Sequence, residues 1–313
     1  MNRRRLLRKP TRMKKPASSP TRRELEDMPE RVIGNLAFDK LEALGNDFML
    51  IDARERSVNL PGEIVRQWAD RHRGVGFDQL LVLRPSDDDT HHCRVEIRNG
   101  DGSEAEQCGN GMRAVALWLS RHDGLEGKVR LATAAGTVEA HYHSDDEISA
   151  TLGVPDFSPT AVGLSGAEGF PRQFTVSGEK VSVYGASMGN PHLLLIDDRP
   201  PEAGRLEHIG RALGQHPALT HGANVGLAMV ESPRRIRLRV FERGAGPTRA
   251  CGSGACAAAA ILLSLDRVEN PVEVVQPGGT LVVNWLGPGQ PVLTTGPARQ
   301  VFEGVISCPT QTS

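Results

Sequence analysis

Short apolar runs separated by Gly, Asn, Asp and Pro recur along most of the chain, a pattern typical of short strands joined by tight turns. Two strands are predicted within residues 36–52, on either side of a Gly45-Asn46-Asp47 turn. Further strands are predicted at residues 79–83, 95–98, 129–152 (two or three strands), 181–186, 193–197, 225–231, 236–241, 272–275 and 281–285. Residues 160–172 are Gly-rich and lack a clear period, which indicates a connection between domains.

A few segments have the composition of helices. Residues 61–72 begin with Pro61, which suits the first turn of a helix, and their apolar side chains fall on one face. Residues 202–213 and the small-residue stretch 251–265 are also predicted helices, and a further apolar helix follows Cys108. The 34 Gly and 21 Pro, with only 4% aromatic residues, agree with a chain that has many strands and turns and few helices.

The second half of the chain repeats the plan of the first. A Gly-Asn turn at residues 45–47 precedes Cys108 by 63 positions, and a Gly-Asn turn at residues 189–191 precedes Cys251 by 62. The strand phrases Glu96-Ile97-Arg98-Asn99 and Val240-Phe241-Glu242 each end nine residues before a cysteine. Each cysteine opens a Cys-Gly-x-Gly phrase that runs into an apolar helix. Four matches in the same order and at near-equal spacing indicate two related domains.

The charges are distributed unevenly. Residues 1–35 hold 11 of the 37 Lys and Arg residues and 4 of the 38 Asp and Glu residues, so the remainder has 26 basic and 34 acidic residues. An acidic body argues against nucleic acid as the main partner. No apolar run approaches the ~20 residues that span a bilayer, and the N-terminus lacks a signal-like apolar segment, so we expect no membrane association and a cytoplasmic protein.

The cysteines are too scattered for a metal site. There are five of them, at Cys93, Cys108, Cys251, Cys256 and Cys308, without any Cys-x-x-Cys pair. In a cytoplasmic protein these thiols stay reduced. We therefore expect no metal, and treat the cysteines as either reactive or simply buried.

A Cys-Gly-x-Gly phrase places a thiol where a helix begins. The helix start offers unpaired N–H groups and a partial positive charge. We expect this environment to stabilise a thiolate and to lower the thiol pKa from ~8.5 toward neutrality. The glycines let a ligand reach the backbone, so that a substrate carboxylate can bind the same N–H groups. For either phrase alone, a buried and inert cysteine is the alternative.

Two such phrases in related domains indicate a specific chemistry. If the domains face each other, the helix starts place Cys108 and Cys251 on opposite sides of one ligand. Inversion of a carbon centre needs this arrangement, since one group removes a proton and the other returns one to the opposite face. The helix ends can also stabilise a carboxylate as the carbanion gains enolate character.

The chain resembles the diaminopimelate epimerases of lysine and cell-wall biosynthesis over about residues 38–306. The resemblance is carried by motifs in both halves. They are Leu44-Gly45-Asn46-Asp47-Phe48, Arg73-Gly74-Val75-Gly76-Phe77-Asp78-Gln79, Asn99-Gly100-Asp101-Gly102-Ser103-Glu104, Gln107-Cys108-Gly109-Asn110-Gly111, Met188-Gly189-Asn190-Pro191-His192, Gly222-Ala223-Asn224-Val225-Gly226, Glu242-Arg243-Gly244-Ala245-Gly246 and Ala250-Cys251-Gly252-Ser253-Gly254-Ala255-Cys256.

The resemblance implies an α+β fold of two pseudo-symmetric domains, each a mixed β-sheet wrapped around a central α-helix. We expect a basic, disordered arm at residues 1–35, a first domain at 36–153 joined by 297–313, and a second domain at 154–296. The implied reaction interconverts LL-2,6-diaminopimelate and meso-2,6-diaminopimelate without pyridoxal phosphate or another cofactor. The resemblance also implies a homodimer, and Phe302 stands where some relatives carry an interface Tyr.

By motif position, Cys108 and Cys251 resemble the two acid–base cysteines of the family, while His192 and Glu242 resemble the groups that tune the proton transfers. The resemblance further implies a set of substrate-binding residues drawn from both halves. These are Asn46, Gln79, Asn99, Gly109, Asn110, Asn190, Asn224, Glu242, Arg243, Gly252 and Ser253.

Two other readings of the same residues stay open. A proline or hydroxyproline racemase would use the same thiol pair, although its smaller substrate needs no Arg for a distal carboxylate. A non-catalytic binding or redox protein would also use paired thiols, although it would need no glycine-rich helix starts. At single positions, His192 could be a core histidine, and Glu242 with Arg243 could be a surface ion pair.

Overall fold

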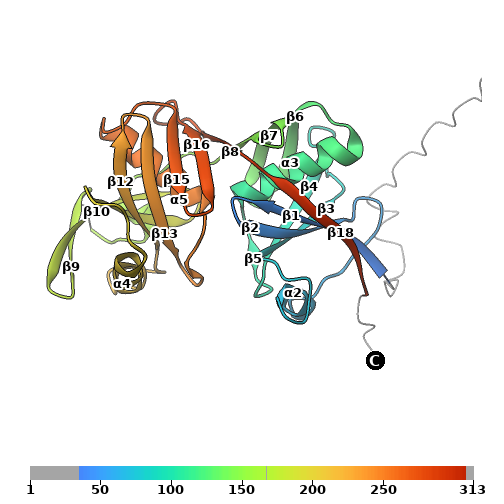
Figure 1. The fold of residues 1–313 in the computed structure, drawn as a ribbon, viewed down its shortest axis with the longest axis horizontal. Coiled ribbons are helices and arrows are strands. Elements are labelled where there is room, and N and C mark those ends of the chain that lie inside the picture. The colour runs from blue at the N-terminus through green and yellow to red at the C-terminus, as the bar shows by residue number, and fades with distance from the viewer. Residues whose placement is uncertain (1–34, 167, 308–313) are drawn as a thin grey trace, which may run out of the picture.

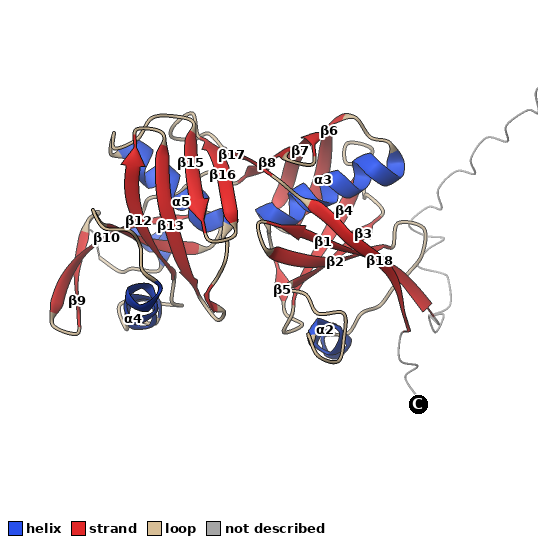
Figure 2. Cartoon of the chain, viewed as in Figure 1, coloured by secondary structure: helices blue, strands red, loops and turns tan. Residues whose placement is uncertain are grey.

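The computed structural model describes residues 35–166 and 168–307. The predicted N-terminal arm lies outside these residues except for Asn35, and Cys308 also lies outside them. Within the described part, strands dominate and helices are few (Figures 1 and 2).

The first half of the chain, together with the last strand, forms one body. Its elements are β1 (Asn35–Ala43), β2 (Asn46–Asp52), α2 (Gly62–Ala69), β3 (Gln79–Arg84), β4 (Cys93–Asn99), β5 (Glu104–Ala105), α3 (Gly109–Asp123), β6 (Gly127–Thr133), β7 (Gly136–Ser144), β8 (Glu147–Leu152) and β18 (Arg299–Ser307). Strand β18 pairs antiparallel with β1, which brings the end of the chain back to its beginning.

The second half has the same kinds of elements. They are the short 3-10 helix η1 (Pro159–Val162), β9 (Arg172–Val176), β10 (Glu179–Ser187), β11 (Pro191–Ile196), α4 (Ala203–Gly214), β12 (Asn224–Ser232), β13 (Arg235–Glu242), β14 (Gly246–Pro247), α5 (Gly252–Ser264), β15 (Val272–Gln276), β16 (Gly279–Asn284) and β17 (Val292–Gly296).

The strand pairing follows one plan in both halves. The parallel pairs β2–β3 and β4–β6 recur as β11–β12 and β13–β15. The antiparallel pair β6–β7, which continues the first sheet, likewise recurs as β15–β16 in the second. Strand β8 pairs with β17 where the two halves join. The predicted internal repeat is therefore a structural repeat, and the predicted α+β fold of two pseudo-symmetric domains is confirmed.

A buried helix occupies the centre of each half (Figure 2). All residues of α3 from Gly109 to Leu119 are buried, as are those of α5 from Gly254 to Leu262. Helix α5 is apolar on every side, and α3 is so apart from residues such as Asn110 and Arg113. Helices of this kind must be enclosed, and the curved sheet of each half encloses them. The amphipathic helices α2 and α4 instead cover the outer faces of the two sheets, where Trp68 and Leu206 are buried.

Some predicted boundaries shift. The helix predicted at 61–72 is only Gly62–Ala69, because Pro61 lies before the helix and Asp70 leaves it with extended backbone. The stretch 160–172 is not a connection between domains: Val162 and Leu164 are buried in the core beneath α4. The chain crosses between the halves just after β8 instead. Strands β9, β17 and β18, and the two-residue strands β5 and β14, were not predicted from the sequence.

We propose, from this strand pairing, that the described parts of residues 36–153 with 297–307 form one domain and those of residues 154–296 the other; residues 308–313, predicted to join the first domain, lie outside the described residues.

A close backbone contact joins the two halves beside the predicted Gly-Asn turn. Leu44, which precedes that turn with φ 57°, is only 4% exposed and packs in the core around α5. Its carbonyl faces the turn between β15 and β16, where a Cβ added to Gly278 would lie 1.8 Å from the Leu44 oxygen. The backbone N of Gly278 also donates to the carbonyl of Arg249 at 2.7 Å.

Replacing Gly278 with Ala is therefore expected to push this contact apart. Overpacking of this kind lowers the free energy of unfolding by about 1–3 kcal/mol. Urea denaturation of Gly278→Ala measures the loss. The control is Gly153→Ala, where the added Cβ meets no atom within 4 Å. An equal effect of both variants would contradict the close contact.

Candidate active site

Cys108 caps the start of α3. Its Sγ accepts a hydrogen bond from the backbone N of Gly111 at 3.3 Å, and its thiol donates to Oδ1 of Asn46 at 3.8 Å. The sulfur therefore satisfies one of the N–H groups that a helix start leaves unpaired. Asn46 opens β2, so the first Gly-Asn turn and the first cysteine meet in space although 62 positions separate the two residues.

Cys251 caps α5 in the same way. Its Sγ accepts from the backbone N of Gly254 at 3.4 Å and lies 3.6 Å from Oγ of Ser253. The backbone N of Cys251 donates to Oε1 of Gln276 at 2.9 Å, which fixes the residue where the chain turns into the helix. The two predicted cysteines therefore occupy equivalent positions in the two halves.

The starts of α3 and α5 lie directly against each other. A Cβ added to Gly252 would lie 3.2 Å from Oδ1 of Asn110, which is itself only 3% exposed. A Cβ added to Gly109 would lie 2.9 Å from the side chain of Leu152. Glycine at position 252 permits this close approach, which brings Asn110 of the first half against the start of α5 in the second half.

Burial reverses the expected ionisation of both thiols. Desolvation raises the pKa of Cys108 to about 11, although the N–H of Gly111 and the charge of Arg113 act to lower it. Desolvation raises the pKa of Cys251 well above its ordinary value, and the nearby Glu242 carboxylate raises it further. The prediction of lowered thiol pKa values is therefore wrong for this buried site, because lost hydration outweighs the helix terminus.

His192 joins the group around Cys251. Its Nε2 lies 3.0 Å from Oδ1 of Asn190 and 3.1 Å from Oγ of Ser253, and Nδ2 of Asn190 donates to the same hydroxyl at 3.3 Å. Because an amide oxygen only accepts, Nε2 carries the proton. Burial, helped by the charge of Arg243, lowers the His192 pKa to about 3, so the ring is neutral at pH 7. His192 is buried, as the alternative of a core histidine requires, but its hydrogen-bond partners Asn190 and Ser253 are both predicted substrate-binding residues.

Glu242 and Arg243 have different partners. Glu242 accepts from Oγ1 of Thr248 at 2.6 Å, and burial raises the pKa of its carboxyl group. Arg243 donates through Nη1 to the carbonyl of His221 at 2.9 Å, and through its backbone N to Oδ1 of Asn224 at the same distance. The alternative of an ion pair between Glu242 and Arg243 therefore describes neither side chain.

Gln79 and Asn99 form a pair across β3 and β4. Nε2 of Gln79 donates to Oδ1 of Asn99 at 3.0 Å, and Nδ2 of Asn99 donates to Oγ of Ser103 at 3.0 Å. Oε1 of Gln79 is buried and has no partner among the described residues. Within residues 35–166 and 168–307, no hydrogen bond joins this pair to either thiol.

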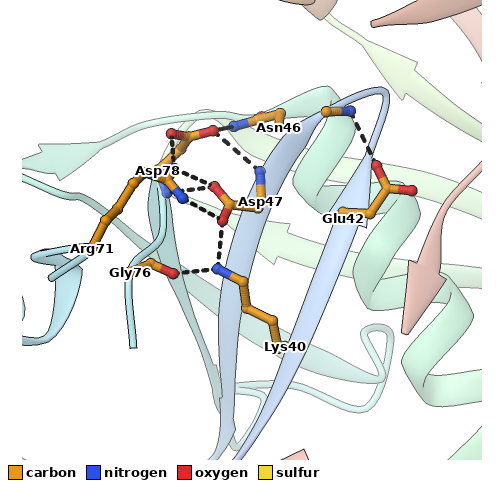
Figure 3. A network of polar contacts seen from close by, with 8 residues as sticks. Lys40, Glu42, Asn46, Asp47, Arg71, Gly76 and Asp78 are labelled. Atoms are coloured by element: carbon orange, nitrogen blue, oxygen red, sulfur yellow. Dashed lines mark hydrogen bonds and ion pairs between the residues drawn. The ribbon is translucent and has the colours of Figure 1, made fainter. Parts of the chain in front are cut away.

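An ionic network lies behind Asn46 (Figure 3). Nδ2 of Asn46 and the backbone N of Asp47 both donate to Oδ2 of Asp78, at 2.9 and 3.1 Å. Arg71 donates to both carboxylates, and Lys40 reaches Asp47 from the other side. Although burial opposes it, hydrogen bonds from Arg71 and Lys40 hold the pKa of Asp47 well below its usual range.

Three residues that the sequence analysis gave no role also contact the site. Gln276 holds the backbone of Cys251, Asp78 holds Asn46, and Arg113 donates through Nη2 to Oδ1 of Asn110 at 2.8 Å. Asp78 lies within a motif noted above, and Arg113 is a cation in an apolar helix. Nothing in the sequence distinguishes Gln276 from other strand-end residues.

Comparison with known proteins points to one family. A family model described as "Diaminopimelate epimerase" matches residues 38–157 and 184–301. A diaminopimelate epimerase of Stutzerimonas stutzeri (strain A1501) is 41% identical over 273 residues, which cover 87% of this chain and 99% of that protein. A diaminopimelate epimerase of Ectopseudomonas mendocina (strain ymp) is 39% identical over the same coverage.

Solved structures with the same fold are much more distant in sequence. A hydroxyproline epimerase from Agrobacterium vitis superposes with a TM-score of 0.66 at 17% identity, covering 87% of this chain and 92% of that one. A probable proline racemase from Agrobacterium radiobacter K84 gives a TM-score of 0.67 at 14% identity, covering 88% and 94%. These likenesses establish the fold alone. By the family match and the two relatives near 40% identity, the chain belongs to the diaminopimelate epimerase family, a family of isomerases.

Proposed function

We propose that this protein interconverts LL-2,6-diaminopimelate and meso-2,6-diaminopimelate by proton transfer between Cys108 and Cys251, without a cofactor. One observation carries the proposal: two equivalent cysteines cap two central helices whose starts lie against each other. One thiolate would remove the α-proton, and the opposite thiol would deliver a proton to the other face. The backbone N–H groups at Gly109 and Gly252 would bind the reacting carboxylate.

The remaining predicted residues suit the rest of the substrate. Diaminopimelate has an ammonium and a carboxylate at each end, so its pocket needs acceptors, donors and a cation. The planar guanidinium of Arg243 would bind the distal carboxylate, because within residues 35–166 and 168–307 its only hydrogen bond goes from Nη1 to the His221 carbonyl. The amide and hydroxyl groups that would supply the other hydrogen bonds are Asn46, Gln79, Asn99, Asn110, Asn190, Asn224 and Ser253.

The protonation states of the site constrain how the reaction starts. Both thiols hold their protons tightly, since burial raises both pKa values. We propose that the neutral His192 and the carboxyl group of Glu242 tune the proton transfers, because Ser253 links the imidazole to Cys251 and the Glu242 carboxylate raises the Cys251 pKa directly.

The low pKa of His192 predicts a pH dependence of stability. Its pKa is about 3 in the folded protein and ~6.5 in an unfolded chain. The stability that the neutral imidazole contributes is therefore complete above pH 6.5 and is lost as the pH falls toward 3.

We expect His192→Asn to lose free energy of unfolding less steeply across this window than the wild type, in urea titrations at several pH values. His208→Asn, on the exposed face of α4, is the control, and a wild-type slope in His192→Asn would contradict a neutral His192.

The two-base mechanism predicts the fate of the proton in heavy water. Product from the first turnovers should carry deuterium at the inverted carbon, while unreacted substrate stays protonated, because the thiol that delivers the proton has already exchanged with solvent. NMR or mass spectrometry of both pools measures this. Cys108→Ala and Cys251→Ala should each abolish epimerisation.

Cys256→Ala is the matched control, since this buried thiol lies on α5 but not at its start. It should retain activity. Early product that kept the substrate's own hydrogen would indicate one mobile base and would exclude the paired-cysteine mechanism.

We further propose that the protein is a homodimer that associates through β18. Among the described strands β18 pairs only with β1, so its other edge is open. Its Val301, Phe302 and Val305 are 55%, 47% and 66% exposed. An apolar edge strand with these side chains in water is prone to pair with another chain, and a second copy would cover it.

Phe302→Asp combined with Val305→Asp is expected to convert the dimer to a monomer, because two charges would be buried in the interface. Sedimentation velocity at micromolar concentration measures the mass. Leu286→Asp is the control, since Leu286 is 79% exposed but lies outside β18. A wild-type protein that sediments as a monomer would refute the proposal.

No helix among the described residues is long and apolar enough to cross a membrane. We propose the cytoplasm as the working compartment, because two acid–base thiols must stay reduced to act.

A further inference from the structure

The direction in which an asparagine side chain faces decides what it can bind. One side of the amide is an oxygen that only accepts hydrogen bonds, and the other is an NH₂ group that only donates them. The two sides have nearly the same shape, so a site needs a neighbour that distinguishes them. Asn110 lies in the first turn of α3, Asn46 contacts the cysteine that caps this helix, and each asparagine contacts a charged residue without an assigned role.

Asp78 distinguishes the two sides of Asn46. A carboxylate accepts and never donates, so the side of the amide that faces Asp78, at 2.9 Å, must be the NH₂ group. Oδ1 is thereby turned toward the thiol of Cys108. Asp78 is itself held in place, because Arg71 donates to its Oδ1 and its backbone N donates to Asp47 (Figure 3).

Arg113 has the opposite effect on Asn110. A guanidinium donates and never accepts, so the side of the amide that faces Nη2, at 2.8 Å, must be Oδ1. Oδ1 also lies toward the start of α5, where a Cβ added to Gly252 would be 3.2 Å from it, so the NH₂ group of Asn110 is turned away from Arg113. Asn110 lies in the first turn of α3, and an NH₂ group held in one direction beside a helix start suits a carboxylate.

Stability alone does not account for Arg113. The side chain is completely buried, and its Nε and Nη1 have no hydrogen-bond partner among the described residues. A buried cation without a counter-ion costs several kcal/mol, and an apolar residue of similar volume is often more stable in its place. A cation at this position is expected only if the site uses its charge or its donors.

We propose that Asp78 and Arg113 are positioning residues, which fix the amides of Asn46 and Asn110 in opposite senses. Asp78 makes Asn46 an acceptor for the Cys108 thiol and for a substrate ammonium. Arg113 makes Asn110 a donor for the reacting carboxylate. The inference rests on the two-cysteine site proposed above, and it assigns to that site two charged residues which act through a neighbouring amide.

Double-mutant cycles on kcat/KM for diaminopimelate test the inference. Asp78→Asn and Arg113→Met are each expected to lower kcat/KM about 10- to 100-fold, a loss typical of residues that orient a site from behind. If each residue acts through its amide, the loss should vanish once the amide is gone. Asp78→Asn in an Asn46→Ala background, and Arg113→Met in an Asn110→Ala background, should then change kcat/KM less than twofold.

A measurement of stability separates positioning from support of the fold. Arg113→Met is expected to keep or raise the wild-type melting temperature while losing activity, because it removes an unpaired buried charge. If this variant does not fold, Arg113→Gln enters the same cycle, since its amide can face Asn110 with either side. Asp52→Asn is the control for Asp78: it removes a carboxylate of the same strand β2 that pairs with Arg54 and, among the described residues, contacts neither Asn46 nor Asp78, so its effect on kcat/KM should be the same with and without Asn46→Ala.

The outcomes are distinct. If Asn46→Ala and Asn110→Ala leave kcat/KM unchanged, the proposed site itself fails. If those variants lose activity but the effects of Asp78→Asn and Arg113→Met persist in full in the alanine backgrounds, the site stands and the positioning inference is overturned.

Discussion

Two helices begin against each other at the centre of this protein, and the rest of the structure depends on how that contact is satisfied. A helix start leaves N–H groups unpaired, and burying them without partners is costly. Here the sulfur atoms of Cys108 and Cys251 accept from Gly111 and Gly254, so the groups that satisfy the helix starts are also the ones proposed to transfer the protons. Glycine beside each cysteine allows the close approach, because a side chain at Gly252 would crowd Asn110.

The same burial also opposes ionisation of the two thiols, which the proposed reaction requires. Desolvation raises both thiol pKa values, whereas proton transfer needs one thiolate. The two halves address this with unlike surroundings on a shared plan. Cys108 faces an amide fixed by an ionic network, and Cys251 lies beside a hydroxyl, a neutral imidazole and a carboxyl group. The two halves share one fold, but the surroundings of their cysteines differ. This difference suits the proposed reaction, in which one cysteine is the base in one direction and the other cysteine in the reverse direction.

Much of the fold could be predicted from the sequence because its signals are local or repeated. Turns such as residues 45–47 and apolar runs such as 225–231 determine their own conformation, and the matched spacing revealed the two halves. Strand β18 could not be predicted in this way, since its exposed Val and Phe residues lack the alternation of a half-buried strand. The stretch 160–172 was misread because the core beneath α4, rather than its own composition, orders Val162 and Leu164.

For the site, the sequence by itself determined the candidate residues: two cysteines at helix starts, with amides, an imidazole and a guanidinium in matching motifs. Only the tertiary structure decided how those groups are charged and which way they face. Thiol ionisation depends on the water that folding removes, so a local helix-start argument gave the wrong direction for both pKa values. The orientation of Asn46 and Asn110 depends on Asp78 and Arg113, whose contacts exist only once the chain has folded.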